Sequence, residues 1–145
     1  MSAIAQDVAS IRDHLRGKTI LIVENDPGNG AFLVEAICLE TPHHSLLATD
    51  STRALEMIEH IKPDLFLLDY GITPLHGLEL YDQLHAHKGL EAIPAIILSA
   101  SAEQHASEIA ARHLIGLNKP VDVEELLQTI EAALTNSPAS SKAVQ

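Results

Sequence analysis

The sequence predicts an α/β protein built on a doubly wound parallel sheet, and two observations carry this prediction. Five short apolar runs follow one another along the chain, at residues 20–23, 46–48, 65–68, 95–98 and 114–117. Amphipathic stretches separate them, which is the pattern of parallel strands that helices cover on both faces. Strict alternation of strands and helices implies right-handed crossovers and an open sheet, for which 2-1-3-4-5 is one of two common strand orders. A closed barrel would need about eight such units.

The first two helices are predicted from residues that begin helices. Asp26 and Pro27 follow the first apolar run and are typical of an N-cap and of the first helical position. The helix continues through apolar residues at 32, 33, 36 and 37. After the second run, Asp50 or Ser51 can cap a second helix, whose apolar residues at 54, 55 and 58 face inward.

The last three helices follow the third, fourth and fifth runs. The third begins after Gly77, and the fourth covers about residues 102–112. The fifth begins at Asp122, where Glu125 three residues later completes the pattern of a capping box. This helix is expected to bury one apolar face, formed by Val123, Leu126, Leu127, Ile130 and Leu134.

Two segments lie outside this repeat, so we predict a single domain over residues 18–135. Residues 1–17 carry apolar side chains at helical spacing, which predicts an amphipathic helix with the stripe Ile4, Val8, Ile11 and Leu15. That stripe is expected to pack on the domain, with a homodimer contact as the alternative. Residues 136–145 are small and polar, which predicts a disordered tail.

The composition argues against several classes of protein. The chain has 20 acidic and 9 basic residues and a net charge of −11, which repels a polyanion and argues against binding DNA or RNA. The one cysteine, Cys38, cannot form an internal disulfide, and no stretch approaches the roughly 20 apolar residues that cross a bilayer. We therefore expect a cytoplasmic protein with no membrane span. The 9 histidines are scattered and are expected to be surface residues.

Polar side chains stand where four of the predicted strands end. Glu24 and Asn25 end the first strand, Asp69 the third, Ser99 the fourth and Lys119 the fifth. Because the carboxyl ends of parallel strands meet at one edge of the sheet, these groups are expected to share a crevice. Oxygen ligands for Mg²⁺, a carboxylate nucleophile, and cationic or hydroxyl donors are what metal-assisted phosphoryl transfer needs.

Five stretches of the chain form a recognisable combination of motifs. They are ILIVENDP at residues 20–27, PDLFLLD at 63–69, GLEL at 77–80, IPAIILSA at 93–100 and NKP at 118–120. Together they resemble the response-regulator receiver family of two-component signalling, over about residues 18–135. The resemblance implies a flavodoxin-like sheet in the order 2-1-3-4-5.

The resemblance also implies roles for the residues at the strand ends. Asp69 would form an acyl phosphate, with a phosphohistidine of a sensor histidine kinase or phosphotransfer protein as the donor. Lys119 would contact the phosphoryl group, Ser99 would move to hydrogen-bond it, and the Lys119–Pro120 peptide would be cis. Mg²⁺ would be held by Glu24, Asn25, Asp69 and the backbone carbonyl of Gly71.

Three positions depart from the family pattern. Asn25 stands where the family has a second acidic residue that binds the metal, so we expect Mg²⁺ to bind weakly. Gly116 stands where the family usually has an aromatic switch residue, so phosphorylation is expected to change the conformation little. Thr73 replaces a usual proline, with Pro74 one place later, which is expected to reshape the site entrance.

The expected function is that of a phosphoacceptor domain read by a downstream protein partner. A pseudo-receiver, acting as a scaffold or dimerisation module without phosphorylation, is the alternative that Asn25 and Gly116 favour. An aspartyl-phosphate hydrolase would need a second carboxylate two residues past the nucleophile, and Gly71 stands there. We therefore expect a signalling module and not an enzyme, beyond self-phosphorylation from a phosphodonor and autodephosphorylation.

Overall fold

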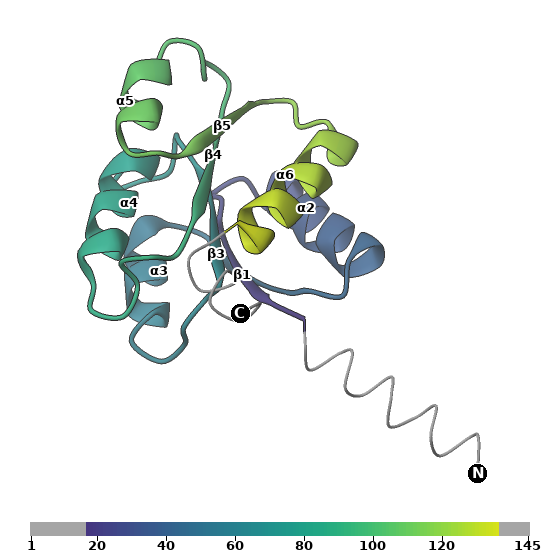
Figure 1. The fold of residues 1–145 in the computed structure, drawn as a ribbon, viewed down its shortest axis with the longest axis horizontal. Helices are drawn as coiled ribbons and strands as arrows, with labels where there is room; N and C mark the ends of the chain where they lie inside the picture. The colour runs from purple at the N-terminus through teal and green to yellow at the C-terminus, as the bar shows by residue number, and fades with distance from the viewer. Residues whose placement is uncertain (1–16, 137–145) are drawn as a thin grey trace.

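The computed structural model describes residues 17–136 and contains one sheet of five parallel strands (Figure 1). The strand order is β2-β1-β3-β4-β5, so the predicted order is confirmed. The strands are β1 (Thr19–Val23), β2 (His44–Ala48), β3 (Leu65–Asp69), β4 (Ala95–Ser99) and β5 (Ile115–Asn118). The predicted apolar runs differ from these bounds by no more than about two residues.

Helices cover both faces of the sheet (Figure 1). On one face lie α2 (Pro27–Glu40) and α6 (Val123–Thr135), and on the other lie α3 (Ser51–Met57), α4 (Gly77–Ala86) and α5 (Ala106–Ala111). Because all five strands are parallel, this doubly wound arrangement brings their carboxyl ends to a single edge of the sheet.

The sheet divides the core into two layers of buried side chains. Phe66 of β3 is the largest fully buried side chain, and it packs in the layer that contains residues of α3 and α4. Its neighbours Leu65 and Leu67 pack in the opposite layer, with Leu33 of α2. A strand buried on both faces is held firmly, so the residue at its carboxyl end, Asp69, has a well-defined position.

The first two predicted helix starts are confirmed. Asp26 accepts the backbone N–H three residues later at 3.0 Å, and Asp50 does the same at 2.7 Å. Asp50, and not Ser51, is therefore the cap of α3. Ser51 is fully buried instead, and its hydroxyl accepts the N–H of Leu75 at 2.9 Å. That bond ties α3 to the loop that follows Asp69.

The capping box predicted for the last helix is wrong. Asp122 does cap α6, but its carboxylate accepts the N–H of Glu124, and no reciprocal bond from Glu125 completes a box. An acceptor that bonds two residues ahead forms a tighter turn than the box requires. A capping box is present instead at the start of α4, where His76 and Glu79 each bond the other's backbone N–H.

Two further helix predictions need correction. The fourth helix was expected over residues 102–112, but α5 spans only Ala106–Ala111, because the chain before it forms tight turns. In these turns each N–H bonds to the carbonyl three residues back, as His105 does to Ala102. On α6, three of the five residues expected inside are buried, whereas Val123 and Leu127 are half-buried.

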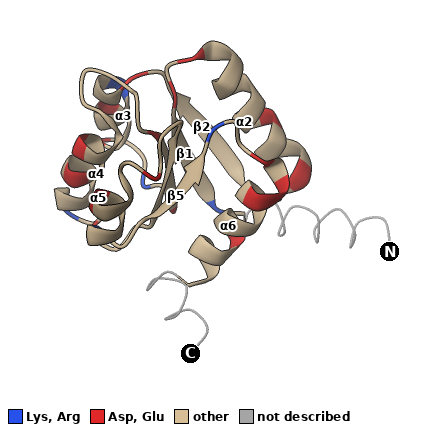
Figure 2. Ribbon diagram, turned by 90° about the horizontal axis from the view of Figure 1, so that it is seen from above, with Lys and Arg blue, Asp and Glu red and all other residues tan. Residues whose placement is uncertain are grey.

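The predicted N-terminal helix, with its apolar stripe at 4, 8, 11 and 15, lies outside the described residues, and so does the predicted tail from residue 137. Within residues 17–136, none of the helices combines the length and apolarity that crossing a bilayer requires. Acidic residues occur along α2, α4 and α6, and the described part of the ribbon carries few basic residues (Figure 2).

Candidate functional site

Polar residues from four different strand ends meet at the carboxyl edge of the sheet. Lys119 joins two of them, because its Nζ lies 2.9 Å from Asp69 Oδ1 and 3.1 Å from Glu24 Oε1. Ser99 ends β4 and lines the same cavity as Asp69 and Lys119. The structure thus brings together residues from positions as far apart in the chain as 24 and 119.

A cavity of about 340 Å³ opens beside these groups. It is lined by Asp69, Tyr70, Gly71, Ser99, Ala100, Ser101, His105 and Lys119. The Ser99 hydroxyl oxygen accepts the backbone N–H of Ser101 at 3.0 Å, which leaves the hydroxyl proton for another acceptor. The cavity therefore places a carboxylate, a hydroxyl donor and an ammonium group around one space.

Burial and hydrogen bonds shift the pKa values of Glu24 and Lys119 at this edge of the sheet. Glu24 is 1% exposed and Asp69 is 7% exposed. The pKa of Glu24 is raised from 4.5 to about 7, first by burial and then by a hydrogen bond with the Asp69 carboxyl, although Lys119 opposes the shift. Burial lowers the pKa of Lys119, but its hydrogen bonds to Asp69 and Glu24 outweigh burial and raise it. Lys119 is therefore a firmly held cation between two buried carboxyl groups.

The sequence profile of the response regulator receiver domain matches residues 20–131. The chain belongs to the response regulator receiver family. It is 32% identical over 133 residues to the phosphate regulon transcriptional regulatory protein PhoB of Pseudomonas aeruginosa. This match covers 88% of the present chain and 56% of PhoB. It is also 26% identical over 122 residues to hybrid signal transduction histidine kinase D of Dictyostelium discoideum, in a match that covers 83% of this chain and 8% of the kinase. The chain thus spans only part of these two relatives.

Solved receiver domains share the fold. One of them is the receiver domain of a sensor histidine kinase from Pseudomonas aeruginosa PAO1, solved with a magnesium ion coordinated in its active-site cleft. It aligns with this chain with a TM-score of 0.73 and 24% identity, and the alignment covers 83% of this chain and 99% of that one. A CheY-like receiver domain protein from Methanospirillum hungatei aligns with a TM-score of 0.73 and 22% identity over 81% of this chain and 94% of that one. The predicted flavodoxin-like receiver fold is therefore confirmed.

The residues expected to hold Mg²⁺ in this receiver are not equally placed. Asn25 is exposed in the loop after β1, whereas Glu24 is buried and bonded to Lys119. Within residues 17–136 there is no group of three or more His, Cys, Asp or Glu side chains that could hold a metal ion. Two carboxylates, one amide oxygen and the Gly71 carbonyl are nevertheless hard oxygen donors of the kind that Mg²⁺ prefers. The donor set fits Mg²⁺, with Lys119 competing for both carboxylates.

Two loops that border the site contain cis peptide bonds. The Lys119–Pro120 peptide is cis, as predicted, and the Thr73–Pro74 peptide is cis as well. The carbonyl of Thr73 accepts the N–H of Ser51 at 3.0 Å, so the loop after Asp69 is bonded to the start of α3.

A side chain at Gly116 would be in tight contact with α5. A Cβ atom at Gly116 would lie 3.0 Å from Cδ1 of Ile109, which is buried on α5. Ile109 therefore packs directly beside the position on β5 where the family usually has an aromatic residue.

Sequence reasoning missed a group of three stacked rings, of which Tyr70 and His105 line the cavity. Tyr70 stacks on His76, with ring centroids 5.0 Å apart, and on His105, with centroids 3.9 Å apart. Both histidines are half-buried at the surface, where the side chain of His76 is 39% exposed and that of His105 is 22% exposed. Tyr70 and His76 come from the loop between β3 and α4, and His105 comes from the loop between β4 and α5. No spacing in the sequence signals that these rings meet.

Gly77 allows α4 to approach the backbone of the loop after Asp69. Its N–H donates to the carbonyl of Tyr70 at 2.8 Å, and a Cβ atom there would lie 2.9 Å from the backbone oxygen of Asp69. We expect Gly77→Ala to destabilise the domain by about 1–3 kcal/mol through overpacking, although helix propensity alone would favour alanine. Urea denaturation measures this difference.

The matched control is Gly71→Ala. A Cβ atom at Gly71 would meet only Asp69 Oδ2, at an ordinary contact distance of 3.9 Å. We expect a change within about 0.5 kcal/mol for this variant. Equal stabilities of the Gly77→Ala and Gly71→Ala proteins would show that the close approach at Gly77 is unimportant.

Proposed function

We propose that this receiver accepts a phosphoryl group on Asp69 and passes the signal to a protein partner. The donor would be a phosphohistidine of a sensor histidine kinase or of a phosphotransfer protein. One observation carries the proposal: Lys119 Nζ bridges Asp69 and Glu24 beside a cavity that Ser99 also lines. The cytoplasmic location expected from the sequence, and the expectation that nucleic acid is not bound, belong to the same proposal.

The chemistry follows from the groups around the cavity. A carboxylate oxygen of Asp69 attacks phosphorus, a new P–O bond forms, and the bond from phosphorus to the donor's imidazole nitrogen breaks. The ammonium group of Lys119, now shared by two carboxyl groups, can neutralise a phosphoryl oxygen instead. The Ser99 hydroxyl can donate its proton to another phosphoryl oxygen. These contacts stabilise charge that is added to a buried edge of the sheet.

Mg²⁺, when bound, would neutralise charge on the phosphoryl oxygens. The residues that would hold it are Asp69, Asn25, Glu24 and the carbonyl of Gly71. Because Lys119 holds both buried carboxyl groups, ion binding and the salt bridges compete for the same oxygens. We propose that this competition, together with the missing charge at Asn25, makes binding weak.

The proposal is tested by incubating the protein with Mg²⁺ and acetyl phosphate and weighing it intact. We expect an adduct with the mass of one phosphoryl group, absent without Mg²⁺ and absent in Asp69→Asn. Asp69→Asn keeps the size of the side chain and removes a negative charge next to Glu24, so this variant is expected to fold. Asp64→Asn, which also changes a carboxylate beside β3, is the control that should keep the adduct.

The opposite outcome has a definite meaning. A wild-type protein that acquires no adduct, even at high Mg²⁺ concentration, would contradict phosphorylation and favour the pseudo-receiver that acts as a scaffold. An adduct that persists in Asp69→Asn would place the phosphoryl group elsewhere.

A further inference from the structure

The stack of Tyr70 on two histidines stands beside Asp69. The planes of Tyr70 and His105 are 14° apart with centroids 3.9 Å apart, and those of Tyr70 and His76 are 12° apart with centroids 5.0 Å apart. Near-parallel rings at such distances attract one another by stacking, and the attraction depends on their relative position. The stack is therefore a specific contact between the segments that carry the rings.

Each ring belongs to a segment that begins or ends at the site. Tyr70 directly follows Asp69, and His76 caps α4. His105 ends the loop that starts at Ser99, and α5 begins at the next residue. The stack thus connects the phosphoacceptor, the loop after Ser99 and the starts of two helices.

The loop after Ser99 has a reason to move when Asp69 is modified. In this structure the Ser99 hydroxyl accepts the N–H of Ser101, and turn bonds link Ser101 to Gln104 and Ala102 to His105. A phosphoryl group on Asp69 would offer an acceptor for the Ser99 hydroxyl proton, and this bond would draw Ser99 toward Asp69. The short turns that follow it would carry this movement to the ring of His105.

We propose that the Tyr70–His105 stack couples phosphorylation of Asp69 to the position of α5. This proposal rests on the proposed function, and it adds the contact through which phosphorylation of Asp69 would change the position of α5. Gly116 supplies no ring, and Ile109 fills the space next to it, so the coupling runs through the β3–α4 and β4–α5 loops. Tyr70 and His105 are positioning residues in this scheme, because they act through the loop that carries Ser99.

Tyrosine fluorescence offers a direct readout. The chain has 2 tyrosines and no tryptophan, so Tyr81→Phe leaves Tyr70 as the fluorophore. Tyrosine emission depends on the groups that its ring contacts. With Mg²⁺ and acetyl phosphate, we expect the emission of Tyr81→Phe to change in proportion to the phosphorylated fraction, which intact mass measures on the same sample.

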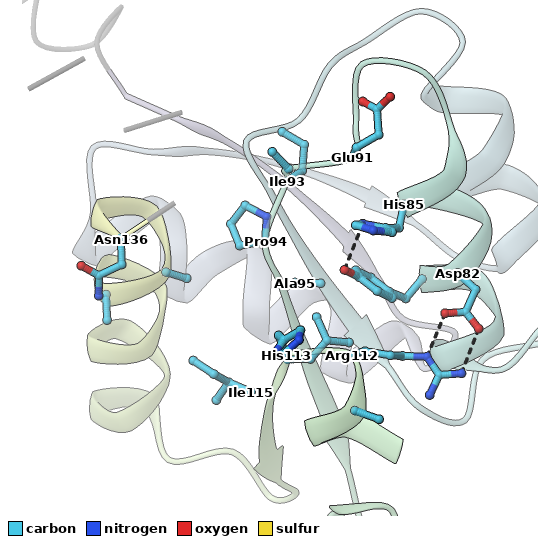
Figure 3. Close-up of a pocket in the computed structure, with 16 residues that line it drawn as sticks. Asp82, His85, Glu91, Ile93, Pro94, Ala95, Arg112, His113, Ile115 and Asn136 are labelled. Carbon is cyan, nitrogen blue, oxygen red and sulfur yellow. Dashed lines mark hydrogen bonds and ion pairs between the residues drawn. The ribbon is translucent and has the colours of Figure 1, made fainter. Parts of the chain in front are cut away.

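The structure supplies a matched control in the second tyrosine. Tyr81 also stacks on a histidine, His85, with centroids 5.2 Å apart, and its hydroxyl lies 3.2 Å from Nδ1 of that ring. This pair lines a different cavity, together with Asp82 and Arg112 (Figure 3). Tyr70→Phe leaves Tyr81 as the fluorophore, and its emission should not follow phosphorylation.

The role of His105 is tested in the Tyr81→Phe background. His105→Ala should abolish the emission change per phosphorylated molecule, and His105→Phe, which keeps a ring to stack on Tyr70, should retain it. An adduct on Tyr81→Phe with unchanged emission would overturn the coupling and leave the phosphoacceptor function standing. An equal response in His105→Ala would also overturn the coupling. If no adduct forms, the proposed function fails, and the coupling fails with it.

Discussion

Without divalent ions, we expect the free energy of unfolding of the wild-type protein to fall by about 2–3 kcal/mol between about pH 5 and about pH 8 because of Glu24. The Glu24→Gln variant should not show this fall. The reason is the pKa of Glu24, which burial raises from 4.5 in its ordinary state to about 7 in the fold. A carboxyl whose pKa is higher in the folded state binds its proton more tightly when folded. Its contribution therefore favours folding below pH 4.5 and is lost as the pH rises toward 7.

Urea denaturation at several pH values, with a chelator present, measures this effect in both proteins. The other titrating groups are common to both, so the difference between the two curves isolates Glu24. The hydrogen bond with Asp69 contributes to the raised pKa of Glu24, so Asp69→Asn should show a weaker pH dependence than the wild type. Parallel curves for the wild type and Glu24→Gln would mean that Glu24 titrates as an exposed carboxyl does.

The fold was predictable because its signals are local and repeated. Each strand contains an apolar run, and the central strands β1, β3 and β4 are buried on both faces. Asp26, Asp50 and Asp122 cap helices where the sequence placed them. The site was predictable for a different reason. In a parallel sheet the strand ends share one edge, so the position of Asp69 and Lys119 in the chain already implied that they meet.

What the sequence did not reveal depends on contacts between segments that lie far apart. Lys119 was expected near a phosphoryl group, and its bridge to Glu24 at 3.1 Å follows from side-chain reach, which no motif encodes. The stacking of two histidines on Tyr70 was not predicted, because a polar ring in a loop gives no periodic signal. The start of α5 was misplaced because the turns before it use bonds between near neighbours that resemble a helix in sequence.

Restoring the second acidic residue of the family pattern is expected to tighten Mg²⁺ binding. We expect Asn25→Asp to lower the dissociation constant about tenfold, which is about 1.4 kcal/mol. At an effective dielectric near 20, one added charge at about 4 Å from a cation is worth about 4 kcal/mol before desolvation is subtracted. Asn25 is exposed, so the new carboxylate pays a small desolvation cost, and Lys119 already holds the carboxylates of Glu24 and Asp69.

Calorimetric titration of Mg²⁺ against the wild type and Asn25→Asp measures the gain. Asn118→Asp is the matched control, because Asn118 is also exposed and lies at the same edge, at the end of β5 and next to Lys119. A direct ligand at position 25 should produce a gain that Asn118→Asp does not share, whereas a general increase in negative charge should help both variants equally. Equal affinities of the wild type and Asn25→Asp would show that position 25 does not contact the ion, and the donor set would then reduce to Asp69, Glu24 and the Gly71 carbonyl.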